Sequence, residues 1–378
     1  MKKHLIFLIL LTVSVLSATA FADSHYAIMV DAGSSGSRLH VFEYEITLSV
    51  PVIKDIFSES VKPGLATFAD HPDAAGLSLK QPLDDARQIL KSKGVSLSLV
   101  PVSIFATAGM RSLPEDKQAI IYQHVTDYLQ QSYPFSIAAV HTISGKMEGL
   151  YGWLDVNYLL GNFTTHQATV GSIDMGGAST QIAFSTEDQT HAEDEIAVTI
   201  DQQRYVIFSK SFLGLGQDQA REAMLANPAA SSCYPEHYLF KGKEQGRFSS
   251  AQCQAVYADL LEQKQVSQQL IPLSGRRFIA YSGIYYTFDF FGVDKTPREA
   301  ELETSLQNVC NNTWEQLKNN YPQVPEKYLA IYCANGIYFE QLLYKTYYLH
   351  DAELTVTNKL NQQEIDWTLG AMLYELVR

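Results

Sequence analysis

Hydrophobic residues recur along the chain with two alternating spacings, which predict strands separated by helices. Apolar positions in 81–93 and 116–131 follow the i, i+3, i+4 spacing of a helix with one buried face. The apolar runs 100–106 and 137–143 are typical of buried strands. The last segment, 367–377, is again helical and apolar on one side. Strands that alternate with helices indicate an α/β architecture.

Two short segments share one pattern: an apolar strand that ends in Asp, a turn of small polar residues, and a β-rich return strand. The first is 28–42, in which Asp31 ends the strand, and the second is 172–184, in which Asp174 does so. About one domain's length separates them. The repetition predicts two related lobes that each contribute one hairpin to a shared cleft.

The first residues differ from the rest of the chain. A basic start is followed by a short apolar run and then by Ala20-Phe21-Ala22, the small-residue pattern at which signal peptidase cleaves. The run is too short for a comfortable membrane span, although a retained N-terminal anchor is the alternative. We therefore expect residues 1–22 to be a signal peptide, and the mature chain to be exported, periplasmic or secreted, without a membrane anchor.

The remaining chain is long enough for two domains with separate cores. We expect an N-terminal lobe over 23–146, to which 355–378 return, and a C-terminal lobe over 147–354. The net charge of -13 argues against a nucleic-acid partner, which normally requires a basic face. It is compatible with a small phosphate ligand, because a metal and backbone N–H groups can meet that charge. We expect a monomer.

Four cysteines lie in the second half of the chain and form two local pairs. Their spacing does not match the Cys-x-x-Cys pattern of zinc or redox sites. We expect the disulfides Cys233–Cys253 and Cys310–Cys333, although free buried thiols are the alternative. Each would close a loop of about 20 residues and contribute roughly 3 kcal/mol to stability.

The two Asp-containing turns carry groups that a phosphate site needs. Their glycines let the backbone approach a ligand, and successive N–H groups form a concavity suited to phosphate. The aspartates would repel phosphate, so we expect them to act through a hydrated divalent cation. An ordinary hairpin would explain one such turn, whereas two matching turns favour a shared site. Hydroxyl donors are supplied by Ser34, Ser35, Ser37, Ser179 and Thr180.

Two charged residues follow buried strands. Arg111 comes after small residues at the end of 100–106, and its permanent charge suits a phosphate. A surface arginine at a helix start would explain that segment if it stood by itself. Glu148 lies beside Gly149 in the connection after 137–143. It could orient and deprotonate a water or stabilise a helix N-terminus, and the spacing does not decide between the two.

Five ordered motifs resemble the apyrase regions of the ecto-nucleoside triphosphate diphosphohydrolase (apyrase) family. They are residues 31–38, 106–111, 146–160, 173–181 and 366–370, so the resemblance covers nearly the whole mature chain. The signal peptide makes the chain look like a secreted bacterial member. The resemblance implies two ribonuclease-H-like lobes of the actin/Hsp70/sugar-kinase superfamily, with the nucleotide in the cleft between them. It also implies removal of terminal phosphates from nucleoside tri- and diphosphates.

The resemblance further implies roles for single residues. Glu148 would activate the attacking water, Gln181 and Ser179 would position that water, and Arg111 and Asn157 would support the site. Mg²⁺ or Ca²⁺, with Mn²⁺ as an alternative, would be held through water by Asp31 and Asp174, with Thr107 nearby, and Trp367 would lie near the cleft. The phosphates would be cradled by Ser34, Ser35, Gly36, Ser37, Arg38, Gly176, Gly177, Ala178 and Thr180.

The base-binding residues are harder to choose, because the C-terminal lobe is rich in aromatic residues. Core packing explains most tyrosines in 281–288 and 328–338. Since stacking on an aromatic ring tolerates any base, we take Tyr285, Tyr286 and Tyr328 as candidates.

Two other functions compete with the hydrolase. A nucleotide-binding module without turnover, related to an Hsp70 lobe, would not need Glu148 and Gln181. A phosphatase of the same superfamily acting on polyphosphate or guanosine tetraphosphate would be cytoplasmic and would lack both the disulfides and the ending 366–370.

Overall fold

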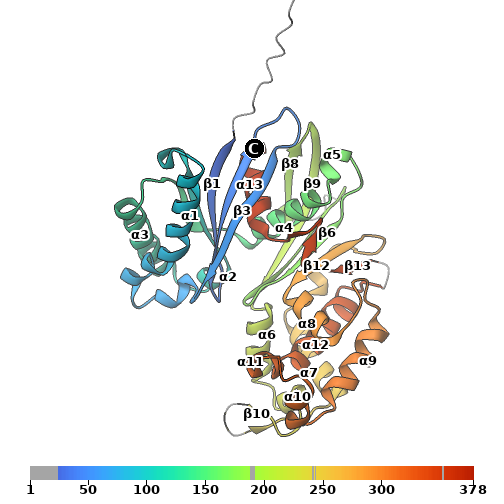
Figure 1. The fold of residues 1–378 in the computed structure, drawn as a ribbon. Helices are drawn as coiled ribbons and strands as arrows, with labels where there is room; N and C mark the ends of the chain where they lie inside the picture. Colours follow the sequence, from blue (N-terminus) through green and yellow to red (C-terminus); the bar gives the residue numbers. More distant parts are fainter. Residues whose placement is uncertain (1–23, 188–191, 241, 243, 351–352) are drawn as a thin grey trace, which may run out of the picture.

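The computed structural model describes residues 24–187, 192–240, 242, 244–350 and 353–378 (Figure 1). The expected signal peptide, 1–22, lies outside these residues. Within them, no helix combines the length and the apolar character needed to cross a membrane. Two β-sheets lie side by side in Figure 1, and a group of helices lies below the second one.

The first sheet is five-stranded, in the order β3-β2-β1-β4-β5. Strands β1, β2 and β3 are antiparallel neighbours, and β4 and β5 run parallel to β1. Alternation along β1 directs Ile28 and Val30 into one hydrophobic cluster and Ala27 and Met29 into another, on the opposite face. The strands are β1 His25–Ala32, β2 Ser37–Glu45, β3 Val52–Val61, β4 Pro101–Ala106 and β5 Ser136–Thr142.

Helices α1 (Lys80–Ser92) and α3 (Glu115–Ser132) supply apolar side chains to the cluster that contains Ile28. Both helices lie on one side of the sheet in Figure 1. They coincide within one residue with the helices predicted over 81–93 and 116–131, and β4 and β5 occupy the two predicted apolar runs. These predictions are confirmed.

The second sheet is six-stranded and repeats the first. Its order is β13-β12-β6-β7-β9-β8. Strands β6, β7 and β9 are antiparallel neighbours, and β12 and β13 run parallel to β6, so β6 corresponds to β1 and β8 is an added edge strand. The internal repeat seen in the sequence is therefore a repeat of topology. The strands are β6 Gly171–Met175, β7 Ser179–Ser185, β8 Glu195–Ile200, β9 Gln203–Leu213, β12 Phe278–Ser282 and β13 Leu354–Val356.

Helices cover the lower end of the second sheet and enclose the largest hydrophobic cluster. The disulfide Cys233–Cys253 joins the segment before β10 to α7, and Cys310–Cys333 joins α9 to α12, as predicted. The helices are α6 Gln217–Met224, α7 Ser250–Gln263, α8 Gly283–Phe291, α9 Glu299–Cys310, α10 Trp314–Asn320, α11 Glu326–Leu329 and α12 Tyr332–Glu340, and a π-helical segment follows at Gln341–Thr346.

Short elements complete the chain. The small hairpins are β10 Leu239–Phe240 with β11 Glu244–Gln245, and β14 Lys359–Leu360 with β15 Gln363–Glu364; the short helices are α2 Ala108–Arg111 and α5 Asn162–Thr165.

Two helices lie between the sheets. Helix α4 (Gly145–Leu159) packs on β6, β7 and β9 of the second sheet, and α13 (Trp367–Val377) packs on α4 and reaches β1 and β3 of the first (Figure 1). Glycines permit this closeness. A Cβ atom at Gly149 would collide with Oγ of Ser209, and one at Gly370 would collide with the carbonyl oxygen of Tyr151. The pair of helices thus joins the chain's end to both sheets.

Candidate active site

The two Asp-tipped hairpins are built alike and touch. Asp31 lies opposite Arg38 in the register of β1 and β2, and Asp174 lies opposite Gln181 in the register of β6 and β7. Their turns meet so closely that a Cβ atom at Gly177 would lie 2.8 Å from Oγ of Ser34. The hairpin of one lobe therefore lies against that of the other.

A cavity of 460 Å³ lies at this meeting point. Both hairpins line it, together with residues from the N-terminus of α4, the first residues of α13 and the helical end of the molecule. The residues predicted for the site that line it are Asp31, Ser34, Ser35, Gly36, Ser37, Arg38, Thr107, Glu148, Asp174, Gly176, Gly177, Ala178, Ser179, Tyr286, Tyr328 and Trp367.

The carboxylates of Asp31 and Asp174 have the character of a cation site. In each, Oδ1 is buried and has no hydrogen-bond partner among the described residues. Burial, followed by the nearby carboxylates of Asp366 and Glu148, raises the pKa of Asp31 well above its usual range. Burial is also the main cause that raises the pKa of Asp174 to about 7. A divalent cation would give both buried carboxylates the partner that they lack, so the residues present fit such a cation.

Glu148 is held in a hydrogen-bonded network at the start of α4. Its Oε2 accepts hydrogen bonds from Nη2 of Arg111 at 2.7 Å and from Nε2 of Gln181 at 3.2 Å. The same two donors reach Oγ of Ser179, at 3.0 Å and 2.7 Å. Burial raises the pKa of Glu148, and the Arg111 guanidinium opposes that shift. Arg111 on α2 and Gln181 on β7 thus fix the Glu148 carboxylate of α4 at the cavity wall.

Three other predicted site residues are absent from the cavity lining among the described residues, and their predicted roles stay predictions. Thr180 is fully buried, and its hydroxyl donates to the carbonyl oxygen of Asp174 rather than facing the cavity. Tyr285 packs against the large cluster of the helical end and contacts Tyr286 edge-on, and it is not among the described residues that line the cavity.

Asn157 is the third. Its Nδ2 donates to the carbonyl oxygens of Trp153 and Val170, both at 2.9 Å. Its Oδ1 accepts from the backbone N–H of Val170 and from Nδ2 of Asn162. This buried side chain fastens α4 to the entry of β6, which is a structural role.

Sequence reasoning missed several residues of the cavity. Asp366, Tyr281, Ser282 and Lys62 line it. Burial alone would raise the pKa of Asp366, but His40 and Arg38 beside it hold that pKa well below its usual range. Ser282 has a φ of 56°, a strained conformation often found at functional sites. Asp366 could have been found, because it begins the last recognised motif and is an N-cap residue type.

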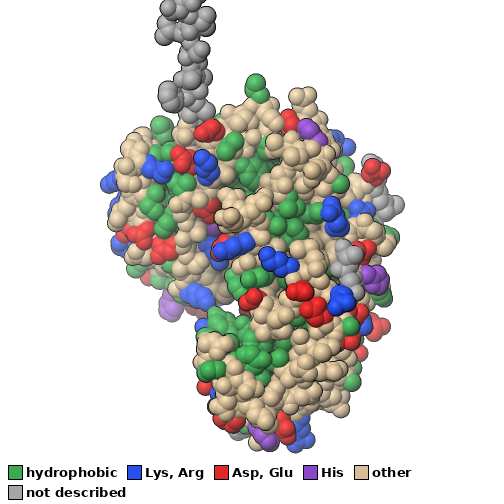
Figure 2. All heavy atoms as spheres, turned by 45° about the vertical axis from the view of Figure 1, so that its right-hand side comes forward, with side chains coloured by type: hydrophobic (Ala, Val, Ile, Leu, Met, Phe, Trp, Pro, Cys, Tyr) green, Lys and Arg blue, Asp and Glu red, His purple; other side chains and the backbone are tan. Residues whose placement is uncertain are grey.

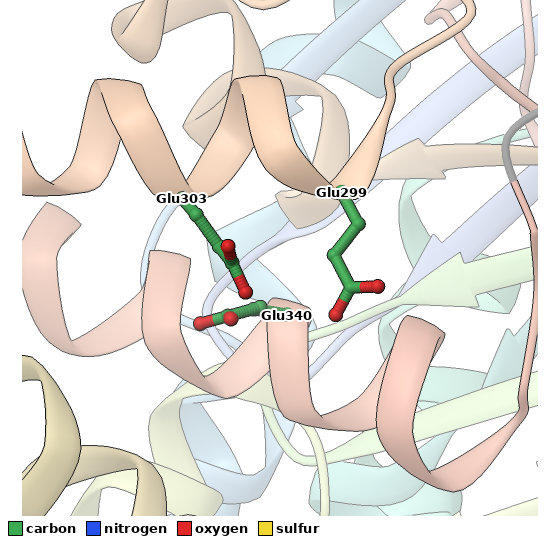
Figure 3. Close-up of side chains that lie close together, drawn as sticks. All are labelled: Glu299, Glu303 and Glu340. Atoms are coloured by element: carbon green, nitrogen blue, oxygen red, sulfur yellow. The ribbon is translucent and has the colours of Figure 1, made fainter.

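A second group of carboxylates lies outside the cavity (Figure 3). Glu299 and Glu303 on α9 meet Glu340 on α12, with one oxygen of each within 4.8 Å of the others. Protein donors already serve this group. Nε2 of Gln254 bonds both oxygens of Glu340, at 3.0 Å and 3.1 Å, and Lys345 pairs with Glu299. The cluster therefore lies where α9 meets α12, separate from the candidate active site.

Figure 2 shows one face of the molecule, on which Lys and Arg side chains are interspersed with Asp and Glu.

Known proteins resemble this chain over most of its length. Residues 18–377 match the model of the GDA1/CD39 (nucleoside phosphatase) family. A protein of Arabidopsis thaliana named probable apyrase 3 is 29% identical over 93% of this chain and 82% of its own length. The mouse (Mus musculus) ectonucleoside triphosphate diphosphohydrolase 1 is 29% identical over 92% of this chain and 80% of its own.

Solved structures share the fold. A nucleoside triphosphate hydrolase from Neospora caninum superposes with a TM-score of 0.69 at 15% identity, covering 94% of this chain and 92% of its own. A Ppx/GppA family protein from Aquifex aeolicus gives a TM-score of 0.59 at 14% identity, covering 94% and 98%. At these identities the likeness concerns the fold, and it confirms the two-lobed α/β architecture.

Proposed function

Because the chain belongs to the GDA1/CD39 (nucleoside phosphatase) family, we propose that it removes the terminal phosphates of nucleoside tri- and diphosphates by hydrolysis. Its relatives include proteins named apyrases and an ectonucleoside triphosphate diphosphohydrolase. One observation carries the proposal for this chain. The two Asp-tipped hairpins and the Glu148 network face a single cavity between the lobes.

The hairpins would hold the phosphate tail and its cation. Residues 34–37 on one side and 176–179 on the other line the cavity from opposite lobes. Asp31 and Asp174 would hold Mg²⁺, Ca²⁺ or Mn²⁺ through water, since each has a buried carboxylate oxygen in need of a partner. When bound, the cation would neutralise charge on the phosphate oxygens.

Glu148 would orient and deprotonate the attacking water. Its known partners, Arg111 and Gln181, both donate to Oε2, which leaves Oε1 to accept a hydrogen bond from water. The hydroxyl oxygen of Ser179 already accepts two hydrogen bonds, so its own proton can be donated to the same water. Phosphoryl transfer asks a protein mainly for this kind of positioning and charge compensation.

Assays of phosphate release test the proposal. ATP, ADP, AMP and polyphosphate would each be supplied with Mg²⁺, Ca²⁺ or Mn²⁺, and with EDTA. We expect release from ATP and ADP, no release from AMP, and no release in EDTA. Nucleotide binding without release would identify a non-hydrolysing module, and turnover of polyphosphate alone would identify a phosphatase of the other type.

Two tyrosines are proposed to contact the base. Tyr286 and Tyr328 line the cavity, and their side chains remain 56% and 40% exposed, as an open stacking surface requires. A stacked ring contributes on the order of 1–3 kcal/mol, so Ala at either position should raise the KM for ATP about tenfold. Tyr348→Ala is the control, since Tyr348 is 65% exposed and lies away from the cavity. Unchanged KM values in both variants would place the base elsewhere.

We further propose that the chain is exported. Its two disulfides suit an oxidising compartment. The mass of the mature protein should show that residues 1–22 are removed; a full-length mature chain would contradict this.

A further inference from the structure

A buried histidine lies behind the phosphate-binding hairpin. His40 is on β2, two residues after Arg38, and is only 3% exposed. Its Nδ1 lies 2.7 Å from Oδ2 of Asp55, in a hydrogen bond. Its Nε2 lies 3.3 Å from Oδ2 of Asp366, which is an ion-pair distance without hydrogen-bond geometry. The ring also stacks on Phe42. Carboxylates on both sides of an imidazole favour the doubly protonated ring, because they attract its positive charge.

Asp366 connects this histidine to the cavity. Its Oδ2 accepts from Nη1 of Arg38 at 3.1 Å, beside His40. Its Oδ1 caps α13, accepting from the backbone N–H of Thr368 at 3.0 Å and from its hydroxyl at 2.7 Å. The backbone N–H of Asp366 donates to Oδ2 of Asp155 at 2.9 Å. With both oxygens occupied, this carboxylate is suited to hold its neighbours in place rather than to bind a cation.

Arg38 brings this chain of contacts to the cavity where the phosphates are proposed to bind. It lines the cavity, and its Nε donates to Oγ of Ser60 at 3.0 Å. Arginine has five N–H donors in a planar fork, and its contacts with Ser60 and Asp366 use two of them. Those two contacts therefore set the plane of the guanidinium, and with it the direction of the remaining donors.

We propose that His40 is a positioning residue for nucleotide binding: supported by Asp55, it anchors Asp366, which orients the Arg38 guanidinium toward the phosphate tail. His40 contacts the cavity through Asp366, whereas Arg38 and Asp366 themselves line it. The inference rests on the proposed function, because it assumes that phosphates bind beside Arg38.

The test compares His40→Gln with the wild type and with the same change in an Arg38→Ala background. We expect His40→Gln to raise the KM for ATP about tenfold and to leave kcat within about threefold, because a small misplacement of a binding group weakens its contact. In the Arg38→Ala background the same change should alter KM less than about twofold, since coupled residues are not additive. His141→Gln, an exposed histidine on β5, is the control and should behave as wild type.

A binding measurement separates this inference from the proposed function. The Kd of a non-hydrolysable ATP analogue with Mg²⁺ should rise in His40→Gln in parallel with KM. An unchanged Kd, or a full-sized effect in the Arg38→Ala background, would overturn the positioning role even if the wild type hydrolyses ATP. If the Kd rises in His40→Gln but the wild type does not hydrolyse ATP, the positioning role is supported and the proposed function is contradicted.

A second variant covers the case in which His40→Gln does not fold. Asp55→Asn keeps the histidine but removes its supporting charge, and Asp55 is partly exposed. We expect the same Kd to rise at least about twofold, in the direction of the His40 effect. Wild-type affinity in a folded Asp55→Asn protein would overturn the inference.

Discussion

Replacing Glu148 by Gln is expected to lower kcat for ATP by a factor of about 10²–10⁴, the usual loss on removal of a general base. Glutamine has the same shape and can still accept the hydrogen bonds of Arg111 and Gln181, so the network around it should persist. It cannot take a proton from water at neutral pH. The KM should stay nearly the same, because the substitution affects proton transfer from the water rather than nucleotide binding.

Folding provides the check on this prediction. Burial raises the pKa of Glu148, so its charge costs free energy in the folded protein and the neutral amide should leave the Tm equal or higher. Glu340→Gln is the matched control, because Glu340 is a fully buried carboxylate outside the cavity. Its kcat should equal that of the wild type. Near-normal turnover in Glu148→Gln would refute the proposed role of Glu148.

Replacing Asp174 by Asn is expected to abolish the response to divalent cations. Turnover should fall by at least about 100-fold, because a metal supplies several kcal/mol of charge stabilisation and each 1.4 kcal/mol is tenfold in rate. In the wild type, a cation at 100 times its Kd should stabilise the fold by about 2.7 kcal/mol. That rise in Tm should be missing from Asp174→Asn.

The same variant should be more stable than the wild type when metal is absent. Burial raises the pKa of Asp174 to about 7, whereas an unfolded Asp titrates near about 4. The favourable protonated form is therefore fully present below about pH 4, and its contribution to stability is lost as pH rises through about 7. In EDTA, the wild-type Tm should fall between pH 5 and pH 8 by more than that of Asp174→Asn.

Calorimetry or circular dichroism with and without Mg²⁺ measures both effects. Asp194→Asn serves as the control, because Asp194 pairs with Lys210 and does not line the cavity among the described residues. A cation that still raises the Tm and restores turnover in Asp174→Asn would show that the metal is held elsewhere.

Local patterns were sufficient for much of this protein. The helices over 80–92 and 115–132 followed from apolar spacing within each helix. The Asp31 and Asp174 hairpins followed from turn residues and flanking strands, all within a few positions of each other. The disulfides followed because each pair of cysteines lies close along the chain. In all these cases the interactions that decide the structure join residues that are close together in the sequence.

Contacts between distant segments could not be predicted in this way. Arg38 and Asp366 are 328 positions apart, and only the return of α13 against β1 and β3 joins them. Asn157 bonds to Val170 and Tyr285 packs against the cluster of the helical end, although both looked like site residues. Which face of a helix meets a ligand depends on what covers its other faces.

The amino-acid sequence by itself determined the two hairpins, their aspartates and the alternation of strands and helices, because propensity and turn chemistry act over a few residues. The tertiary structure alone decided that the hairpins touch at Ser34 and Gly177, that Arg111 and Gln181 hold Glu148, and that His40 lies behind Arg38. Those contacts depend on the packing of α4 and α13 between the two sheets. Segments far apart in the sequence bury their apolar side chains there together, and this places their polar side chains side by side.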